Sequence, residues 1–257
     1  MDFMGKIAVI TGGASGLGRA SALKFASGGA KVAIFDIDDE KGESVIKECM
    51  NKGTKGLFIH CDVTSETEVV EAYSQVVSTF GAVDILHINT GIIDKVTFVS
   101  ELSFDDWKKV INVNLNGAFL TAKYGISQML NQDKGVIVFT GSNWAYVCDP
   151  GFTSYAASKG GVVAFARALA LDHAKDNIRI NVICPGNMVT PLLERQLSLE
   201  DDPEAVLESM GQISTPEEVA NLVAFLASDE SSAMKGSAVI IDQGETLGYG
   251  HGLRVER

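Results

Sequence analysis

Short apolar runs rich in β-branched residues recur along the chain, with helical stretches between them. Runs of this length are typical of strands buried on both faces, and their alternation with helices is typical of a parallel sheet. The seven expected strands are 6–11, 31–36, 56–61, 83–88, 135–140, 178–183 and 237–242. The pattern therefore predicts an α/β fold, a doubly wound seven-stranded parallel sheet with helices on both faces.

Helices are expected at 66–80, 104–130, 154–175 and 215–228. Two of them have recognisable starts, because Thr64 or Ser65 precedes the first and Thr215 stands before Pro216 and two glutamates. No Gly/Ser/Pro linker, tandem repeat or low-complexity tract divides the chain. Because 257 residues with 46% hydrophobic content can bury a substantial core, we expect a single domain over 1–257.

The charge balance narrows the choice of partners. Lysine and arginine number 21 against 33 aspartates and glutamates, so the chain lacks the basic excess that nucleic acid or an anionic membrane requires. No apolar run reaches the roughly 18 residues that span a bilayer, and the first strand follows without a signal peptide, so we expect a cytoplasmic protein.

Cysteine and histidine give no sign of a metal site. Cys49, Cys61, Cys148 and Cys184 form no CxxC pair and have no histidine at metal-ligand spacing, so we expect reduced packing residues and no metal. The four histidines are scattered, and we assign no chemistry to them.

A glycine-rich loop, Thr-Gly-Gly-Ala-Ser-Gly-Leu-Gly over 11–18, follows the first expected strand. Its glycines permit a tight turn, close approach of backbone to a pyrophosphate and close packing of helix on strand. The phosphates would then meet the amino end of a helix. Such a loop can be an ordinary connection, but the strand before it and the helix after it favour a dinucleotide site. The expected contacts are Gly12, Ser15, Gly16, Leu17 and Gly18.

An aspartate ends the second expected strand, eighteen residues beyond Gly18. Asp36 is placed to accept hydrogen bonds from both hydroxyls of the adenosine ribose, although it could instead be a turn residue at a strand end. A 2′-phosphate would meet its carboxylate, and neither Ser15 nor Ile37 offers a positive charge to hold that phosphate. We therefore predict NAD rather than NADP as the cofactor.

A tyrosine and a lysine stand four residues apart in the helix expected at 154–175. This spacing places Tyr155 and Lys159 on one helical face. A phenol with a pKa of about 10 is a poor base at neutral pH, but a neighbouring ammonium favours the phenolate and lowers that pKa. The pair occurs by chance on many helices, so it gains weight from the loop at 11–18.

Together, the loop and this pair resemble the short-chain dehydrogenase/reductase family over nearly the whole chain, which implies a Rossmann-type fold. The resemblance implies that Tyr155 donates or takes a hydroxyl proton, and that Lys159 lowers its pKa and binds the nicotinamide ribose. The family's serine, thirteen residues before the tyrosine, corresponds to Ser142 and would orient and polarise the carbonyl. Its asparagine corresponds to Asn114, which would support a proton-relay water.

Further cofactor contacts implied by the family are Asp62 and Val63 near the adenine, Ile37 beside Asp36, Asn89 and Gly91 after the fourth strand, and Pro185, Gly186, Met188 and Thr190 near the nicotinamide. Three positions depart from the family pattern. Thr90 stands where alanine is usual, Met188 replaces a β-branched residue, and Gln243 replaces a glycine and would narrow the allowed backbone angles. None of them removes a catalytic group.

The resemblance also suggests how the work is divided along the chain. Residues 1–100 are expected mainly to bind the dinucleotide, and 101–257 to carry the catalytic residues, a substrate loop over 188–212 and oligomer contacts. The acidic run at 200–204 is either a solvated loop or part of a mobile cover over the site. The family implies a homotetramer, in which the tail 249–257 is expected to cover a neighbouring subunit's site.

The expected reaction is hydride transfer between NAD and a secondary alcohol or ketone. Segments 92–98, 143–153 and 188–212 should wall the substrate crevice, because they follow the carboxyl ends of strands. Their mixed side chains do not distinguish a polyol or sugar from a hydroxysteroid or other cyclic alcohol as the substrate. The apolar candidates are Trp144, Tyr146, Val147, Phe152, Met188, Leu192 and Leu193, and the polar ones are Asn143, Asp94, Lys95 and Glu194.

Two other functions are compatible with a dinucleotide fold. An NADPH-dependent 3-oxoacyl-type ketoreductase is opposed by Asp36, because like charges repel. A non-catalytic dinucleotide-binding scaffold would have no need for the set of Asn114, Ser142, Tyr155 and Lys159.

Overall fold

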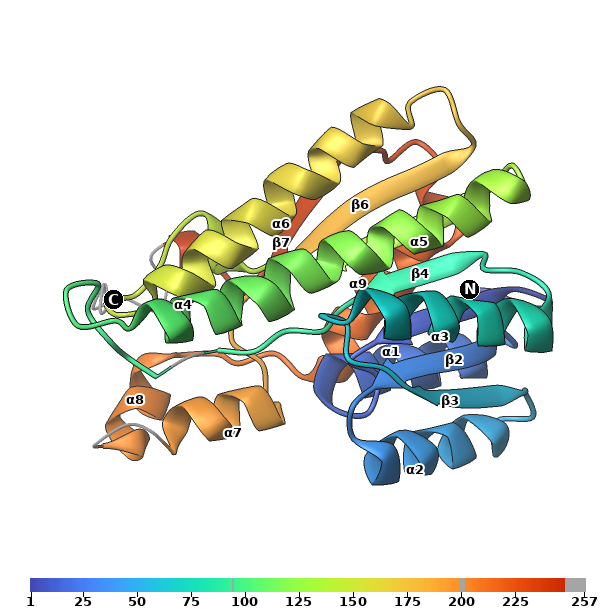
Figure 1. Ribbon diagram of the computed structural model, residues 1–257. Coiled ribbons are helices and arrows are strands. Elements are labelled where there is room, and N and C mark those ends of the chain that lie inside the picture. Colours follow the sequence, from blue (N-terminus) through green and yellow to red (C-terminus); the bar gives the residue numbers. More distant parts are fainter. Residues whose placement is uncertain (94, 199–201, 248–257) are drawn as a thin grey trace.

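Seven parallel strands form one sheet in the order β3-β2-β1-β4-β5-β6-β7 (Figure 1). The computed structural model describes residues 1–93, 95–198 and 202–247. The strands are β1 (Ile7–Thr11), β2 (Lys31–Asp36), β3 (Gly56–His60), β4 (Ile85–Ile88), β5 (Gly135–Thr140), β6 (Ile178–Pro185) and β7 (Ala238–Ile241). The predicted fold is confirmed, and every strand bound lies within two residues of its expected position.

Helices cover both faces of the sheet, because successive side chains of each strand point to opposite sides. Ile7 and Val9 of β1 pack toward one group of helices, whereas Ala8 and Ile10 pack toward the other. The first group is α3 (Glu66–Phe80), α5 (Gly117–Asn131) and α6 (Thr153–Asp172), and the second is α1 (Gly16–Ser27), α2 (Asp39–Met50) and α9 (Pro216–Ala227). Two apolar cores therefore hold the sheet rigidly between them.

The helix expected over 104–130 is one helical run with an irregular turn inside it. α4 (Phe104–Ile111) passes into a single π-helical turn (Asn112–Asn116) and then into α5. A π turn inserts one extra residue into a helix and re-aims the side chains around it. This turn carries Asn114, which is 1% exposed.

The segment expected as a substrate loop, 188–212, contains two short helices, α7 (Pro191–Leu197) and α8 (Pro203–Ser209). The loop expectation is thus wrong in its local structure. Each helix begins with proline behind a capping residue: Thr190 accepts a hydrogen bond from Leu193 N, and Asp202 accepts one from Ala205 N. Within the acidic run, residues 200 and 201 lie outside the described residues, as does the tail 249–257.

The reversal of strand order between β1 and β4 opens the sheet at one end. β2 and β3 lie on one side of β1, whereas β4 to β7 follow one another on the other side. The loops that follow β1 and β4 therefore diverge and leave a crevice at the carboxyl ends of the strands.

Candidate active site

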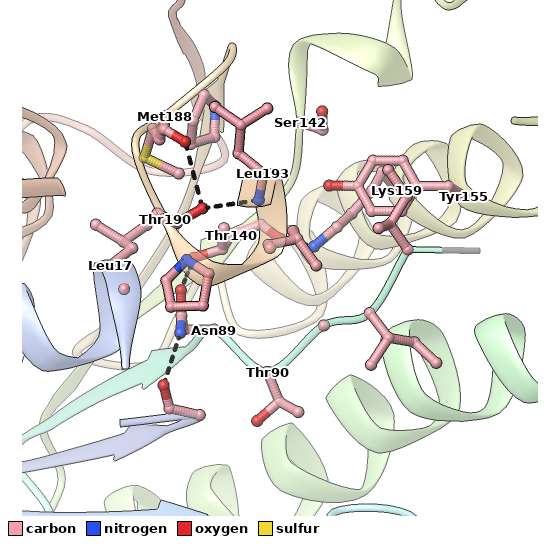
Figure 2. A pocket seen from close by; sticks show the side chains of 18 of the residues that line it. Leu17, Asn89, Thr90, Thr140, Ser142, Tyr155, Lys159, Met188, Thr190 and Leu193 are labelled. Atoms are coloured by element: carbon pink, nitrogen blue, oxygen red, sulfur yellow. Dashed lines mark hydrogen bonds between the residues drawn. The ribbon is translucent and has the colours of Figure 1, made fainter. Parts of the chain in front are cut away.

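A cavity of about 310 Å³ occupies this crevice, between the loops that follow β1, β2, β4, β5 and β6 (Figure 2). Most predicted site residues reach it, although they are scattered along the sequence. Those that line it are Gly12, Ser15, Gly16, Leu17, Asp36, Ile37, Asn89, Gly91, Ser142, Tyr155, Lys159, Pro185, Gly186, Met188 and Thr190.

The glycine-rich loop has the backbone that its sequence implies. Gly12 and Gly16 adopt positive φ angles of +64° and +51°, which side chains rarely tolerate. A Cβ on Gly18 would lie 1.9 Å from the Gly12 carbonyl oxygen, so only glycine lets helix α1 pack this closely behind the loop. Gly18 therefore shapes the loop from behind and does not line the cavity.

The amino end of α1 faces the same cavity. Its N-cap residue, Ser15, makes no side-chain hydrogen bond to the helix, so the first backbone N–H groups have no side-chain cap. Unpaired N–H groups and the helix dipole together favour an anion at this position. The narrow glycine backbone and this helix end fit the pyrophosphate of a dinucleotide.

Asp36 lies where the cavity reaches the end of β2. Its carboxylate accepts hydrogen bonds from Ala14 N at 2.9 Å and Asp38 N at 3.1 Å. Among the described residues no lysine or arginine forms an ion pair with it, and its neighbour Ile37 is 65% exposed. This end of the cavity thus presents a carboxylate that has no ion-pair partner in the described part of the chain, which suits ribose hydroxyls and disfavours a phosphate.

Tyr155, Lys159 and Ser142 meet at the other end (Figure 2). Tyr155 and Lys159 are four residues apart on α6, and both are buried. Figure 2 shows the phenol oxygen and the ammonium pointing the same way. Lys159 Nζ donates to the Thr140 carbonyl at 2.9 Å, and Ser142 Oγ accepts from Trp144 N at 3.1 Å. The three groups therefore lie together with defined orientations, in an arrangement that can transfer a proton.

The expected lowering of the Tyr155 pKa is not found in the free protein. Burial raises the pKa of Tyr155 to about 12, and the hydrogen bond with Ser142 only partly opposes this. Burial also lowers the pKa of Lys159 to about 8. Desolvation is the largest cause of both shifts. The ammonium donates to the Thr140 carbonyl and lies 5.7 Å from the phenol ring centre.

Asn114 supports the site from behind the cavity wall. Its Oδ1 accepts from Ile92 N at 2.8 Å, and its Nδ2 donates to the Ile92 carbonyl at 2.9 Å and to Ser158 Oγ at 3.0 Å. These bonds clamp the segment after β4 to α6. The side chain is therefore occupied by protein groups, and it does not line the cavity.

The two predicted adenine contacts also stay away from the cavity. The Asp62 carboxylate accepts from both the backbone N and the hydroxyl of Thr64, and Val63 packs against Gly117 of α5. Of the polar substrate candidates, Asn143 lines the cavity, Lys95 and Glu194 are exposed, and Asp94 lies outside the described residues.

Several cavity residues carry no motif that sequence reasoning could have used. Thr140, Asn187 and Gln196 line the wall, and Gln196 is buried on α7. The departures from the family pattern are accommodated: Thr90 and Met188 line the cavity, and Gln243 takes a positive φ of +56° beyond β7. The only earlier signal for Gln196 would have been the helix start at Thr190-Pro191.

In the described part of the chain, no group of three or more His, Cys, Asp or Glu side chains could hold a metal ion. Cys49, Cys61 and Cys184 are buried packing residues, as expected, whereas Cys148 is exposed. Across the same ranges, no helix is both long and apolar enough to cross a bilayer.

The fold and the site together define a doubly wound α/β protein whose glycine-rich loop and Ser142, Tyr155 and Lys159 side chains line one cavity. Residues 6–201 match the family model for short chain dehydrogenase. The chain therefore belongs to the short-chain dehydrogenase/reductase family, whose members are oxidoreductases that bind a nicotinamide dinucleotide.

Two curated relatives show the range of activities among similar proteins. The chain is 36% identical to a cyclohexanol dehydrogenase of Acinetobacter sp. (strain SE19), over 93% of this chain and 94% of the relative. It is 37% identical to a 3-oxoacyl-[acyl-carrier-protein] reductase of Thermotoga maritima, over 95% of this chain and 99% of the relative.

Two solved structures resemble the whole fold. Levodione reductase superposes with a TM-score of 0.93 at 31% identity, covering 96% of this chain and all of its own. NAD⁺-bound xylitol dehydrogenase superposes with a TM-score of 0.90 at 33% identity, covering 94% of this chain and 99% of its own.

Proposed function

We propose that the protein is an NAD-dependent dehydrogenase/reductase that acts on a secondary alcohol and its ketone. One observation carries this proposal: a single cavity runs from the Asp36 carboxylate to the Ser142, Tyr155 and Lys159 side chains. In this assignment the loop at 11–18 and the amino end of α1 hold the pyrophosphate, Asp36 binds the adenosine ribose, and Lys159 binds the nicotinamide ribose.

The chain's own groups handle the substrate oxygen and its proton. When bound, the dinucleotide accepts a hydride from the alcohol carbon or returns one to the ketone carbon. Ser142 Oγ holds the substrate oxygen, and Tyr155 takes its proton in oxidation or supplies one in reduction. The Lys159 ammonium stabilises the phenolate that oxidation requires, while Asn114 keeps the segment after β4 fixed against α6.

The preference for NAD over NADP rests on charge. A 2′-phosphate at the adenosine ribose would face the Asp36 carboxylate, with only the apolar Ile37 beside it. The structural relative named as NAD⁺-bound xylitol dehydrogenase supports this preference.

The substrate end of the cavity favours a cyclic secondary alcohol over a polyol or sugar. Trp144 packs on Phe152 with ring centres 4.7 Å apart and meets Tyr155 edge-on at 5.7 Å. Ile93 and Val110 complete this apolar cluster, and Ile92 and Leu192 pack against it. An alicyclic ring gains from contact with this cluster, whereas polyol hydroxyls that face it would lack partners, which is costly. Similarity to cyclohexanol dehydrogenase and levodione reductase supports this choice.

Thermal protection by NAD, NADH, NADP and NADPH tests the cofactor assignment, and the best cofactor is then tried with cyclohexanol-type alcohols, polyols and a 3-oxoacyl thioester. We expect selective protection by NAD or NADH, followed by turnover of a cyclic alcohol. Preferential protection by NADPH with reduction of the thioester would establish the ketoreductase instead. Protection without turnover of any substrate would favour a binding scaffold.

The variant Asp36→Asn tests whether the negative charge of Asp36, and not its hydrogen bond to the glycine-rich loop, selects the cofactor. The amide keeps an oxygen that can accept from Ala14 N, so the glycine-rich loop retains its contact. Removing the charge should weaken NAD binding and raise NADP affinity by roughly tenfold or more, because the repulsion is gone. Dissociation constants for both cofactors provide the measurement. An unchanged NADP:NAD ratio would show that Asp36 does not select the cofactor.

Tyr155→Phe tests the proton transfer. The ring packs as before against Trp144, but the donor and acceptor oxygen is lost. We expect NADH affinity to stay within about twofold and kcat to fall by roughly 10²–10⁴. Steady-state kinetics and a binding titration on the same preparation distinguish the two effects, and a variant with full turnover would contradict the mechanism.

A further inference from the structure

A buried histidine stands behind the site, and the chemistry proposed above does not use it. His87 in β4 is fully buried, and its Nε2 lies 2.9 Å from Thr140 Oγ1 at the end of β5. Its Nδ1 has no hydrogen-bond partner among the described residues. The other residues of β4, Ile85, Leu86 and Ile88, are apolar core residues. A half-satisfied imidazole among them costs free energy, which calls for a compensating role.

The hydrogen bond between His87 and Thr140 is the first in a series of hydrogen bonds that reaches the glycine-rich loop. Thr140 Oγ1 lies 3.2 Å from Asn89 Oδ1, and Asn89 Nδ2 lies 3.2 Å from the Gly12 carbonyl oxygen (Figure 2). The same amide lies close beneath Gly18, since a Cβ there would be 2.8 Å from Asn89 Nδ2. Side chains of β4, of β5 and of the residue that follows β4 thus lead to the loop that we assign to the pyrophosphate.

The Gly12 end of this series of hydrogen bonds fixes which group donates in each of them. The Gly12 carbonyl can only accept, so Asn89 must present Nδ2 to it and Oδ1 to Thr140. Oδ1 can only accept, so the Thr140 hydroxyl donates its one hydrogen to Asn89. Thr140 Oγ1 must therefore accept the hydrogen bond that joins it to His87, and His87 Nε2 donates it. The other neutral tautomer would take the Thr140 proton away from Asn89. The network therefore assigns the Nε2–H tautomer and leaves Nδ1 as the bare nitrogen.

Thr140 also anchors the proton-transfer centre. Its main-chain carbonyl accepts the hydrogen bond from Lys159 Nζ at 2.9 Å. Burial, reinforced by the nearby Lys159 ammonium, lowers the pKa of His87 to about 3, so the ring stays neutral. A second proton on His87 would point from Nδ1 at no acceptor.

We propose that His87 is a positioning residue for the dinucleotide: its Nε2–H orients Thr140 and Asn89, and through them the Gly12 carbonyl and the carbonyl that holds Lys159. The inference rests on the proposed dinucleotide site. It predicts that the loss of the His87 donor is felt at a loop to which His87 itself is not bonded.

His87→Leu removes the donor, and His87→Gln restores an N–H that can reach Thr140. Titration of protein fluorescence with NADH should show affinity about fivefold weaker for the leucine variant and recovered by glutamine, as expected for one lost hydrogen bond. Thr140→Val should weaken binding at least as much, and Thr140→Ser should retain it. The double variant His87→Leu/Thr140→Val should bind no more weakly than Thr140→Val alone, because both changes break one chain.

Thr121→Val provides the matched control. Thr121 is buried, and among the described residues its hydroxyl bonds only the Gly117 carbonyl within α5, so NADH affinity should not change. A merely structural role for His87 would lower the melting temperature of the free protein and leave NADH affinity at the wild-type value, which would overturn the inference while the proposed function stands. Wild-type protein that binds neither NADH nor NADPH would overturn the proposed function itself.

The tautomer has a signature of its own. In ¹⁵N-histidine-labelled wild-type protein, the ring of His87 should show a proton on Nε2 and none on Nδ1 across neutral pH. A proton on Nδ1 would reverse the bond to Thr140 and overturn the inference without any cofactor present. If His87→Leu does not fold, this spectrum and the Thr140→Val and Thr140→Ser pair still decide the question.

Discussion

Burial moves the pKa values of Tyr155 and Lys159 in opposite directions, and each shift favours the uncharged form. The phenol rises to about 12 and the ammonium falls to about 8. At neutral pH the free protein therefore holds a protonated phenol beside a protonated lysine. Under the proposed function, this state can deliver a proton to a ketone, whereas oxidation requires that the phenol first lose its proton.

The pH dependence of ketone reduction should follow Lys159. Because its pKa is depressed to about 8, the ammonium is present below that pH and lost above it. We expect kcat/KM for reduction to be level at neutral pH and to fall as the pH rises through about 8. Lys159→Arg should abolish this fall, whatever its absolute rate, because a guanidinium stays charged up to a pH of about 12. A fall at the same pH in the arginine variant would assign it to another group.

Motif residues were predictable from the sequence because the glycine-rich loop, the Tyr/Lys pair and the family resemblance together fix their positions. Ser142, Tyr155 and Lys159 line the cavity as expected, and so do Asp36 and the loop residues Gly12 and Gly16. Residues that act through tertiary contacts were not predictable. A histidine in an apolar strand has the same sequence signature whether it only packs or also orients Thr140, so His87 could not be distinguished from an ordinary core histidine.

At the scale of elements, α7 and α8 begin with the same sequence pattern as α9, a capping residue followed by proline, although neither helix was predicted. Thr215-Pro216 correctly marks the start of α9, where Thr215 and Glu218 form a capping box. Thr190-Pro191 and Asp202-Pro203 repeat the same pattern of capping residue and proline. The short length of these helices hid them, because seven residues are too few to show a helical period.

The cap of α7 should control how firmly the cavity is covered. Thr190→Ala removes the oxygen that accepts from Leu193 N and should cost about 1 kcal/mol of local stability. Amide hydrogen exchange in 191–197 should then be about fivefold faster. Thr215→Ala is the matched control, since it should speed exchange in α9 and leave α7 unchanged. Exchange in α7 that does not respond to Thr190→Ala would show that packing, not the cap, holds this helix.

The π turn between α4 and α5 could not be predicted from pattern. The residues Asn112–Asn116 include no glycine or proline, so nothing local distinguishes them from regular helix. What favours the irregular turn is the pair of bonds from the Asn114 side chain to Ile92. Those bonds depend on a segment from another part of the chain, which a periodicity argument does not see.

At the scale of the whole molecule, the homotetramer stays a proposal, and we place its contacts at exposed apolar side chains of α5 and β7. Phe119 on α5 is 47% exposed and meets Phe165 of α6 at 6.0 Å between ring centres, and Ile240 on the edge strand β7 is 41% exposed. Phe119→Glu should shift the mass by light scattering from about four times 27.3 kDa to a smaller species. Met50→Glu, at a 54% exposed position on α2, should not. A wild-type monomer would refute the tetramer.

The fold class followed from the sequence because seven buried runs alternate with helices, and few architectures satisfy that alternation. The division of labour expected at residue 100 is less sharp in the structure. Leu17 and Asp36 from the first part and Leu192 and Leu193 from the second line one cavity. Residues of both parts therefore line one cavity, and we propose that neither half of the chain forms its site alone.

The central place of β1 has a consequence for the protein's synthesis. β1 pairs with β2 on one side and with β4 on the other, yet β4 begins only at Ile85. While the chain grows from its amino end, the strands β1 to β3 can assemble, but the inner edge of β1 stays bare until β4 leaves the ribosome. Each later strand then covers one edge and opens another, up to β7. A chain whose synthesis ends within this stretch thus carries an unpaired parallel edge, which is the kind of surface that aggregates.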